Sequence, residues 1–104
     1  MKNKNIAKKY ARALYNVAVQ IDEVQDVKSR VRYLVDVIKT IPELKHLLQT
    51  HQISVQDKIS ILENVLSNSI KSLEIELIKE IITNHSIIIL GEISKHFEYL
   101  IQID

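Results

Sequence analysis

Turn-forming residues are almost absent from this chain, which holds one glycine and one proline among 104 residues. A β-protein needs glycine, proline and similar residues at its tight turns, whereas helices joined by short polar loops do not. Apolar residues make up 46% of the chain and recur at helical spacing along most of it. We therefore expect an all-α fold, a compact single-domain bundle of about six helices.

Apolar periodicity and capping residues divide the chain into its expected helices, which cover about 6–21, 22–39, 41–50, 55–66, 72–84 and 86–101. Three acidic residues are expected in the first turns of the second helix, where the helix dipole favours them: Asp22, Glu23 and Asp26. Thr40 and Glu43 have the spacing of a capping box, with Pro42 in the first turn of the third helix. Ser54 is the expected N-cap of the fourth helix, and residues 67–69 are expected to form a loop.

The first expected helix carries two apolar strips, each with the spacing i, i+4, i+7 and i+11. One strip consists of Ala7, Ala11, Leu14 and Ala18, and the other of Ile6, Tyr10, Ala13 and Val17. A surface helix needs an apolar face of ~100° to sit on a core, and the two strips together span close to twice that. The surplus surface must cover a second layer of the same domain or a partner.

The fifth expected helix has a similar surplus. Its apolar residues lie on two sides, Ile75, Ile78 and Ile82 on one and Leu73 and Leu77 on the other, with Ile81 between them. Glu80 borders the second side. Two interpretations are open from periodicity alone: the two helices are the central pair of the bundle, or a groove between them receives an amphipathic helix from a partner.

Charge is spread unevenly along the chain, although the net value of +1 is too balanced for a general polyanion binder. The first twelve residues form a basic tip with no acidic residue, containing Lys2, Lys4, Lys8, Lys9 and Arg12. Such a tip could bind phosphates or an acidic membrane surface, and an ordinary solvated helix start has the same composition. A small helical nucleic-acid-binding domain is therefore the alternative function.

Residue patterns typical of enzymes are missing. The chain has no cysteine, which excludes disulfides, thiolate metal sites and cysteine nucleophiles. Its four histidines lack the i, i+4 spacing of helical metal sites, and the carboxylate pair Glu76 and Glu80 has no Glu-x-x-His companion. A single glycine, Gly91, provides no phosphate-cradling loop. We expect no catalysis, no metal and no cofactor; a bundle enzyme with a di-metal carboxylate site is a further alternative.

Targeting and membrane segments are not expected either. The longest unbroken apolar run is Ile87–Leu90, whereas a spanning helix needs ~20 residues. The N-terminus lacks the apolar region and the small-residue cleavage site of a signal peptide. We therefore expect no direct insertion into a membrane.

Several segments, in their order and spacing, resemble the delta subunit of ATP synthase, called oligomycin-sensitivity-conferring protein in mitochondria. The opening helix, Ile6–Ala18, resembles the Tyr-Ala-x-Ala-aromatic helix with which that family begins. The similarity continues through Ile41–Leu48, Ile53-Ser54 followed by Lys58, Leu77-Ile78 to Asn84, and Ile93–Phe97. It covers essentially the whole chain.

The resemblance implies a six-helix N-terminal domain that caps the catalytic head of the synthase. In the family, this domain binds the N-terminal helix of an alpha subunit in a groove between the first and fifth helices. The resemblance therefore implies a non-catalytic part of the stator, or peripheral stalk, of a proton-transporting complex. The implied groove residues are Ile6, Tyr10, Ala13, Leu14 and Val17 on the first helix and Leu73, Leu77, Glu80, Ile81 and Asn84 on the fifth. The strip containing Ala7 and Leu14 would face the core, so Leu14 is expected at both the core and the groove.

The sequence departs from the family pattern in two respects. His85 and Ser86 stand where family members commonly have Gly-Arg, so a left-handed helix cap would fall on a non-glycine residue, most tolerably Asn84. The chain also stops at Asp104, and we expect residues 1–104 to be the head-binding domain without the C-terminal domain that meets the b subunits. The lack of a presequence and the heavy use of Ile, Asn and Lys suggest a bacterial protein, peripheral on the cytoplasmic face of the inner membrane. The resemblance implies neither nucleic acid nor a cofactor.

Overall fold

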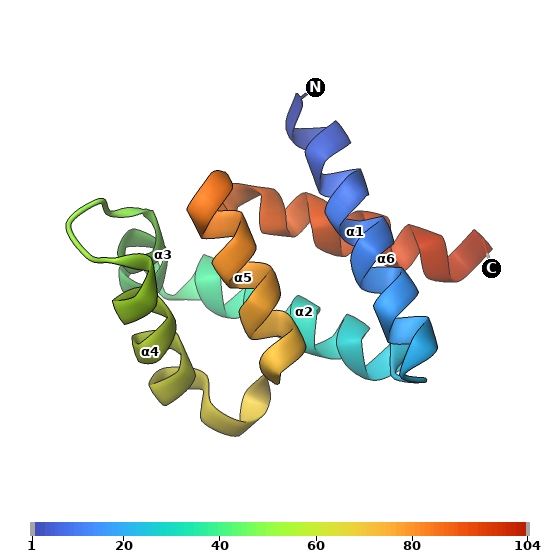
Figure 1. Cartoon of the computed structure of the whole chain (residues 1–104), viewed down its shortest axis with the longest axis horizontal. Helices are drawn as coiled ribbons and strands as arrows, with labels where there is room; N and C mark the ends of the chain where they lie inside the picture. The colour runs from blue at the N-terminus through green and yellow to red at the C-terminus, as the bar shows by residue number, and fades with distance from the viewer. Residues whose placement is uncertain (1, 104) are drawn as a thin grey trace. The chain divides into compact units, whose positions relative to one another are not determined.

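The computed structural model describes residues 2–103, and for Lys2 only the backbone. It contains six α-helices (Figure 1): α1 Lys2–Gln20, α2 Val24–Thr40, α3 Pro42–Gln49, α4 Val55–Leu66, α5 Ser72–Asn84 and α6 Leu90–Ile103. Two single 3-10 turns, η1 Ser67–Ser69 and η2 Ile87–Ile89, precede α5 and α6. No strand occurs within residues 2–103. The predicted fold class and number of helices are confirmed.

The chain divides into two compact units, which we describe separately. The first comprises residues 1–35 and 88–104, and therefore contains α1, the first part of α2, and α6. The second comprises residues 36–87, with the end of α2 followed by α3, α4 and α5.

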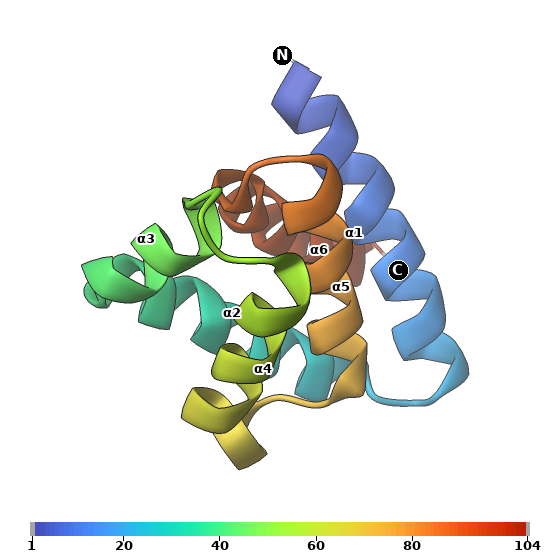
Figure 2. The same ribbon diagram turned by 60° about the vertical axis from the view of Figure 1, so that its left-hand side comes forward.

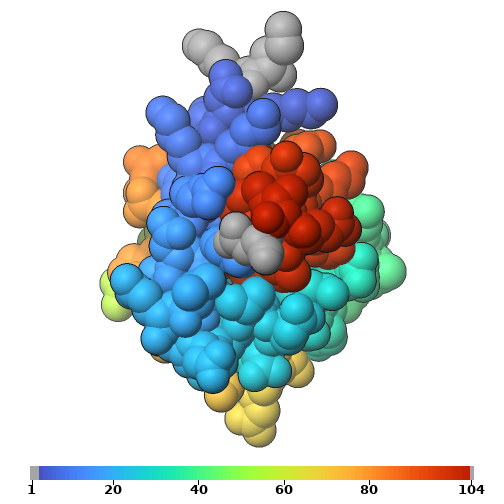
Figure 3. All heavy atoms as spheres, turned by 90° about the vertical axis from the view of Figure 1, so that its right-hand side faces the viewer, coloured from blue at the N-terminus to red at the C-terminus, as the bar shows by residue number. Residues whose placement is uncertain are grey.

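The core of the first unit lies between α1 and α6, whose blue and red surfaces adjoin in Figure 3. The first apolar strip of α1 is buried as a whole: Ala7, Ala11, Leu14 and Ala18. Three of its four members are alanines, so the backbones of two helices can approach closely there. Tyr15 meets Phe97 edge-on, with 5.8 Å between ring centroids. Such aromatic pairs contribute about 0.5–1.5 kcal/mol beyond the area they bury.

The turn between α1 and α2 is a Schellman motif centred on Asp22, whose φ is +56°. The Glu23 amide donates to the carbonyl of Ala18 at 2.9 Å, and the Asp22 amide to that of Val19 at 3.1 Å. The prediction that Asp22 and Glu23 lie in the first turns of the second helix is therefore wrong. These two residues close α1, and only Asp26 of the three acids lies in the first turn of α2.

The connection between α2 and α3, in the second unit, differs from the predicted capping box. Thr40 ends α2, and its hydroxyl donates back to the Asp36 carbonyl at 2.9 Å. The N-cap of α3 is Ile41, with extended backbone and no side-chain cap. Pro42 disfavours helical backbone at the residue before it, so the break falls at Ile41 and α3 begins at Pro42 itself.

Helices α4 and α5 pack against each other in the second unit (Figure 2). Ser54 caps α4 as predicted, because its Oγ accepts the Asp57 amide at 3.1 Å. The expected loop at residues 67–69 forms the turn η1, and Ser67 enters it with a φ of +43°. Before α5, the Glu74 carboxylate accepts the amide of Lys71 at 2.8 Å.

The end of α5 and the start of α6 correct two further predictions. Asn84 does not take a left-handed conformation; the chain leaves α5 through His85, whose backbone is extended and whose amide donates to the Ile81 carbonyl at 2.6 Å. An extended exit needs no glycine. The last helix begins at Leu90 and not at Ser86, because Ile87–Ile89 form a 3-10 turn.

Candidate functional site

The second apolar strip of α1 lies partly in solvent, in contrast to the buried first strip. Ile6 and Tyr10 are half-buried, while Ala13 and Val17 are exposed, Val17 by 38%. Leu14, which was expected at both the core and the groove, is buried. This strip lies in the first unit. It offers an apolar, solvent-accessible surface along about three turns of helix.

The predicted residues of α5 lie in the second unit and differ in exposure. Leu77 and Ile81 are buried and Leu73 is half-buried. Glu80 and Asn84 are exposed, and the Asn84 side-chain amide donates both to the Glu80 carboxylate at 3.1 Å and to its backbone carbonyl at 3.2 Å. The surface of α5 at these positions therefore presents one leucine beside an organised polar pair.

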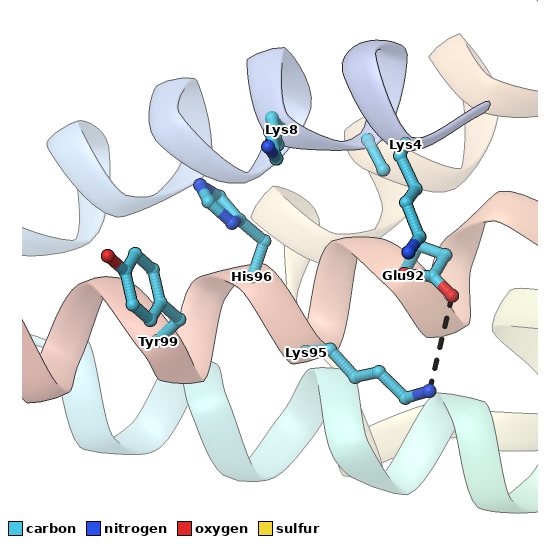
Figure 4. A pocket seen from close by; sticks show the side chains of 7 residues that line it. Lys4, Lys8, Glu92, Lys95, His96 and Tyr99 are labelled. Atoms are coloured by element: carbon cyan, nitrogen blue, oxygen red, sulfur yellow. Dashed lines mark ion pairs between the residues drawn. The ribbon is translucent and has the colours of Figure 1, made fainter. Parts of the chain in front are cut away.

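Part of the basic tip lines a pocket of about 240 Å³ between α1 and α6 (Figure 4). Lys4 and Lys8 of α1 face Glu92, Lys95 and His96 of α6 there. Glu92 and Lys95 form an ion pair at 4.0 Å. The side chain of Lys2, also predicted in the basic tip, lies outside the described residues. Because the pocket contains a carboxylate, the tip is less strongly positive than the first twelve residues alone indicate.

The environment of His96 disfavours its charged form. Burial is the largest cause, followed by the positive charges of Lys8 and Arg12, and together they lower the pKa of His96 from its ordinary value of 6.5. Its ring also lies 5.4 Å from that of Tyr99. The neutral imidazole is therefore the favoured form of His96, between α1 and α6, near neutral pH.

Tyr15, Lys58 and Glu74 are among the buried side chains that the sequence reasoning did not identify as buried. Tyr15 follows Ala11 by four residues, so the spacing of the buried strip could have identified it. Glu74 lies in the first turn of α5, where a carboxylate can accept a backbone amide. Lys58 gave no such signal, because a lysine within a helix is expected in solvent.

The residues considered for metal chemistry remain dispersed. Within the described residues, no three His, Asp or Glu side chains gather as a group that could hold a metal ion. His46 and His51 are exposed at either side of the end of α3. None of the helices in the described part of the chain is sufficiently long and apolar to span a bilayer.

Comparison with known proteins gave one finding of similarity. Searches of curated proteins and of solved structures returned no match. A protein-family model described as the ATP synthase delta (OSCP) subunit matches residues 6–104, which confirms the resemblance found in the sequence. The chain therefore belongs to the ATP synthase delta (OSCP) subunit family, whose members are peripheral, structural subunits in the stator of that enzyme.

Proposed function

We propose that this chain is the head-binding part of an ATP synthase stator and that it binds the N-terminal helix of an alpha subunit. In this proposal the incoming helix is amphipathic and lays its apolar face on the second strip of α1. On α5, the predicted residues that keep accessible surface, Leu73, Glu80 and Asn84, would also contact this helix, as the family resemblance implies. The chain does no chemistry; it holds the catalytic head against the torque of the rotor.

The observation that carries the proposal is the exposure of the second strip of α1. A helix at the centre of a bundle would bury both of its apolar strips, whereas Ala13 and Val17 are exposed. The four residues of the second strip follow the i, i+3/i+4, i+7 spacing of the anchor residues of helices that bind in a groove. The strip is therefore suited to a partner that is itself helical and apolar on one face.

The exposed part of α5 supports the same kind of partner. Leu73 is a further accessible apolar side chain, and the Asn84 side-chain amide already donates a hydrogen bond to the Glu80 carboxylate. Polar groups at the edge of an apolar contact fix the register of a docking helix more than they add to its affinity. Glu80 would favour a basic or amide side chain on the partner at that edge.

The free energy for docking comes mainly from apolar burial, at about 25 cal/mol per Å². An alpha-subunit segment that is unstructured when free must also become helical, which costs about 2–5 kcal/mol. Several anchors along the strip are therefore needed, and no single residue can provide the affinity.

The remaining features of this role are part of the proposal. Residues 1–104 would act as the N-terminal domain of a delta subunit, and contact with b subunits would need the C-terminal domain that such subunits carry. The place of action would be the cytoplasmic face of a bacterial inner membrane, reached through the complex and not by insertion.

The test is calorimetric titration of the chain with a peptide of the first ~20 residues of the alpha subunit from the same organism, long enough to form a helix on binding. We expect saturation at one peptide per chain. A peptide of the same composition in scrambled order keeps the charge but loses the apolar face, and should not bind. Equal binding of both peptides, or no binding of either, would contradict the proposal.

A further inference from the structure

A second pocket lies within the second unit, at the end of α3 and the end of α5, and has a volume of about 360 Å³. Its apolar walls are Leu48, Ile82 and Ile87. Its polar lining comes from the loop after α3, from α4 and from the two residues that follow α5. None of these residues belongs to the second strip of α1.

The pocket contains a buried lysine. Lys58 on α4 is only 5% exposed, and its Nζ donates to the Leu48 carbonyl at 3.3 Å. This carbonyl is among the last four of α3, which lack partners within the helix. The ammonium therefore caps the negative end of α3. That contact accounts for one of its three donors.

The two other ammonium protons meet no acceptor among the described residues, and both the lysine and its carbonyl partner line the pocket. A buried cationic group is stabilised when its remaining donors are satisfied. An acceptor entering from the pocket would satisfy them.

The rest of the polar lining also favours an anion. It consists of the side chains of Gln49, His51, His85 and Ser86, all of which can donate hydrogen bonds. No aspartate or glutamate occurs among the described residues that line the pocket. The described lining therefore contains a positive ammonium group and no negative side chain.

We propose that this pocket is a binding site for a small organic carboxylate. The carboxylate would accept hydrogen bonds from Lys58, and its short apolar body would lie against Leu48, Ile82 and Ile87. One buried ammonium matches the single charge of a carboxylate, whereas a phosphate dianion would be left with uncompensated charge beside apolar walls. The site would be independent of alpha-subunit binding.

The test is an NMR titration of the 15N-labelled chain with butyrate and, separately, with butyramide at the same ionic strength. Butyramide has the same shape without the charge. We expect saturable shifts around Gln49, His51 and Lys58 with butyrate, and an affinity for butyramide lower by about tenfold or more, because hydrogen bonds to charged groups are the stronger ones. Equal effects of the two compounds, no saturable binding of butyrate, or tighter binding of inorganic phosphate than of butyrate would overturn the proposal.

Two variants locate the site. Lys58→Met keeps an unbranched apolar side chain, one atom shorter, and removes the donors; it should weaken butyrate binding by about tenfold or more. Lys45→Met is the matched control, since Lys45 is exposed on α3 and does not line the pocket; its affinity should stay within about twofold of the original. Equal losses in the two variants would overturn the assignment. If circular dichroism finds Lys58→Met unfolded, the butyrate–butyramide comparison on the unmodified chain decides the question.

Discussion

Replacing Val17 by aspartate is the sharpest perturbation of the proposed alpha-subunit site. The exposed 38% of Val17 is the part that a docking helix can still bury. Scaled from the ~1.5–3 kcal/mol for burying a whole valine or leucine side chain, this part contributes about 0.6–1.1 kcal/mol to binding. A carboxylate at the same place must also lose water against an apolar partner, which costs at least about 1–3 kcal/mol. The total, about 2–4 kcal/mol, predicts a loss of affinity of roughly 30-fold or more.

Asn16→Asp is the matched control, because it places the same new residue one position away, on the polar arc of α1, where Asn16 is exposed. Calorimetric titration of both variants with the alpha-subunit peptide separates the effect of charge from that of position. We expect the control to bind within about threefold of the original chain, as surface charges contribute little. If the two variants lose the same affinity while keeping the same melting temperature, the assignment of the strip as the docking surface is refuted.

Three further predictions concern the fold. Phe97→Ala should lower the free energy of unfolding by about 3–5 kcal/mol, since Phe97 is 1% exposed and meets Tyr15; a loss below about 1 kcal/mol in urea denaturation would contradict the packing described. Asp22→Gly should be more stable than Asp22→Ala by about 1 kcal/mol in the same assay, because only glycine takes a φ of +56° without steric cost, and the reverse order would exclude the left-handed turn. Because the pKa of His96 is lowered in the folded chain, the unfolded chain takes up a proton at this histidine at higher pH than the folded chain does. The stability due to the neutral ring is therefore present above pH 6.5, and it is lost as the pH falls from there through the lowered pKa of the folded state. His96→Gln should therefore lose less melting temperature than the original chain between about pH 7.5 and 5.5, and equal losses would show that His96 is not desolvated in the fold.

The helices could be predicted from the sequence because apolar spacing is set by burial, and burial dominates the energetics of helices in proteins. The strip of Ala7, Ala11, Leu14 and Ala18 is buried as a unit. The N-cap at Ser54 could also be predicted, because the hydroxyl of an N-cap serine accepts a hydrogen bond from a backbone amide only three residues further on, here that of Asp57. Both features depend on a short stretch of sequence.

Predictions failed where a residue had two possible local conformations or hydrogen-bond partners. The Thr40 hydroxyl could cap α3 or bond back into α2, and the restriction that Pro42 places on Ile41 decided for α2. The expectation for Asn84 assumed that α5 would reverse through a left-handed residue. The chain instead leaves α5 extended, and it is Asp22 that takes the left-handed conformation, at the end of α1.

The candidate sites were only partly accessible to sequence reasoning. Periodicity identified the two strips of α1, but it could not tell which would stay in solvent, because that depends on the elements packed around the helix. The pocket around Lys58 was not predicted, since it joins residues from α3, α4 and α5. A buried lysine becomes visible only once the carbonyl that it caps is located in space.

Mapping the alpha-subunit peptide on the 15N-labelled chain by NMR tests whether the second strip of α1 is the docking surface. The proposal predicts shifts that saturate at one peptide per chain and concentrate at Tyr10, Ala13 and Val17 on α1 and at Leu73, Glu80 and Asn84 on α5, the predicted residues of α5 that keep accessible surface. Shifts confined to the basic tip between Lys4 and Arg12, or no shifts at all, would contradict it.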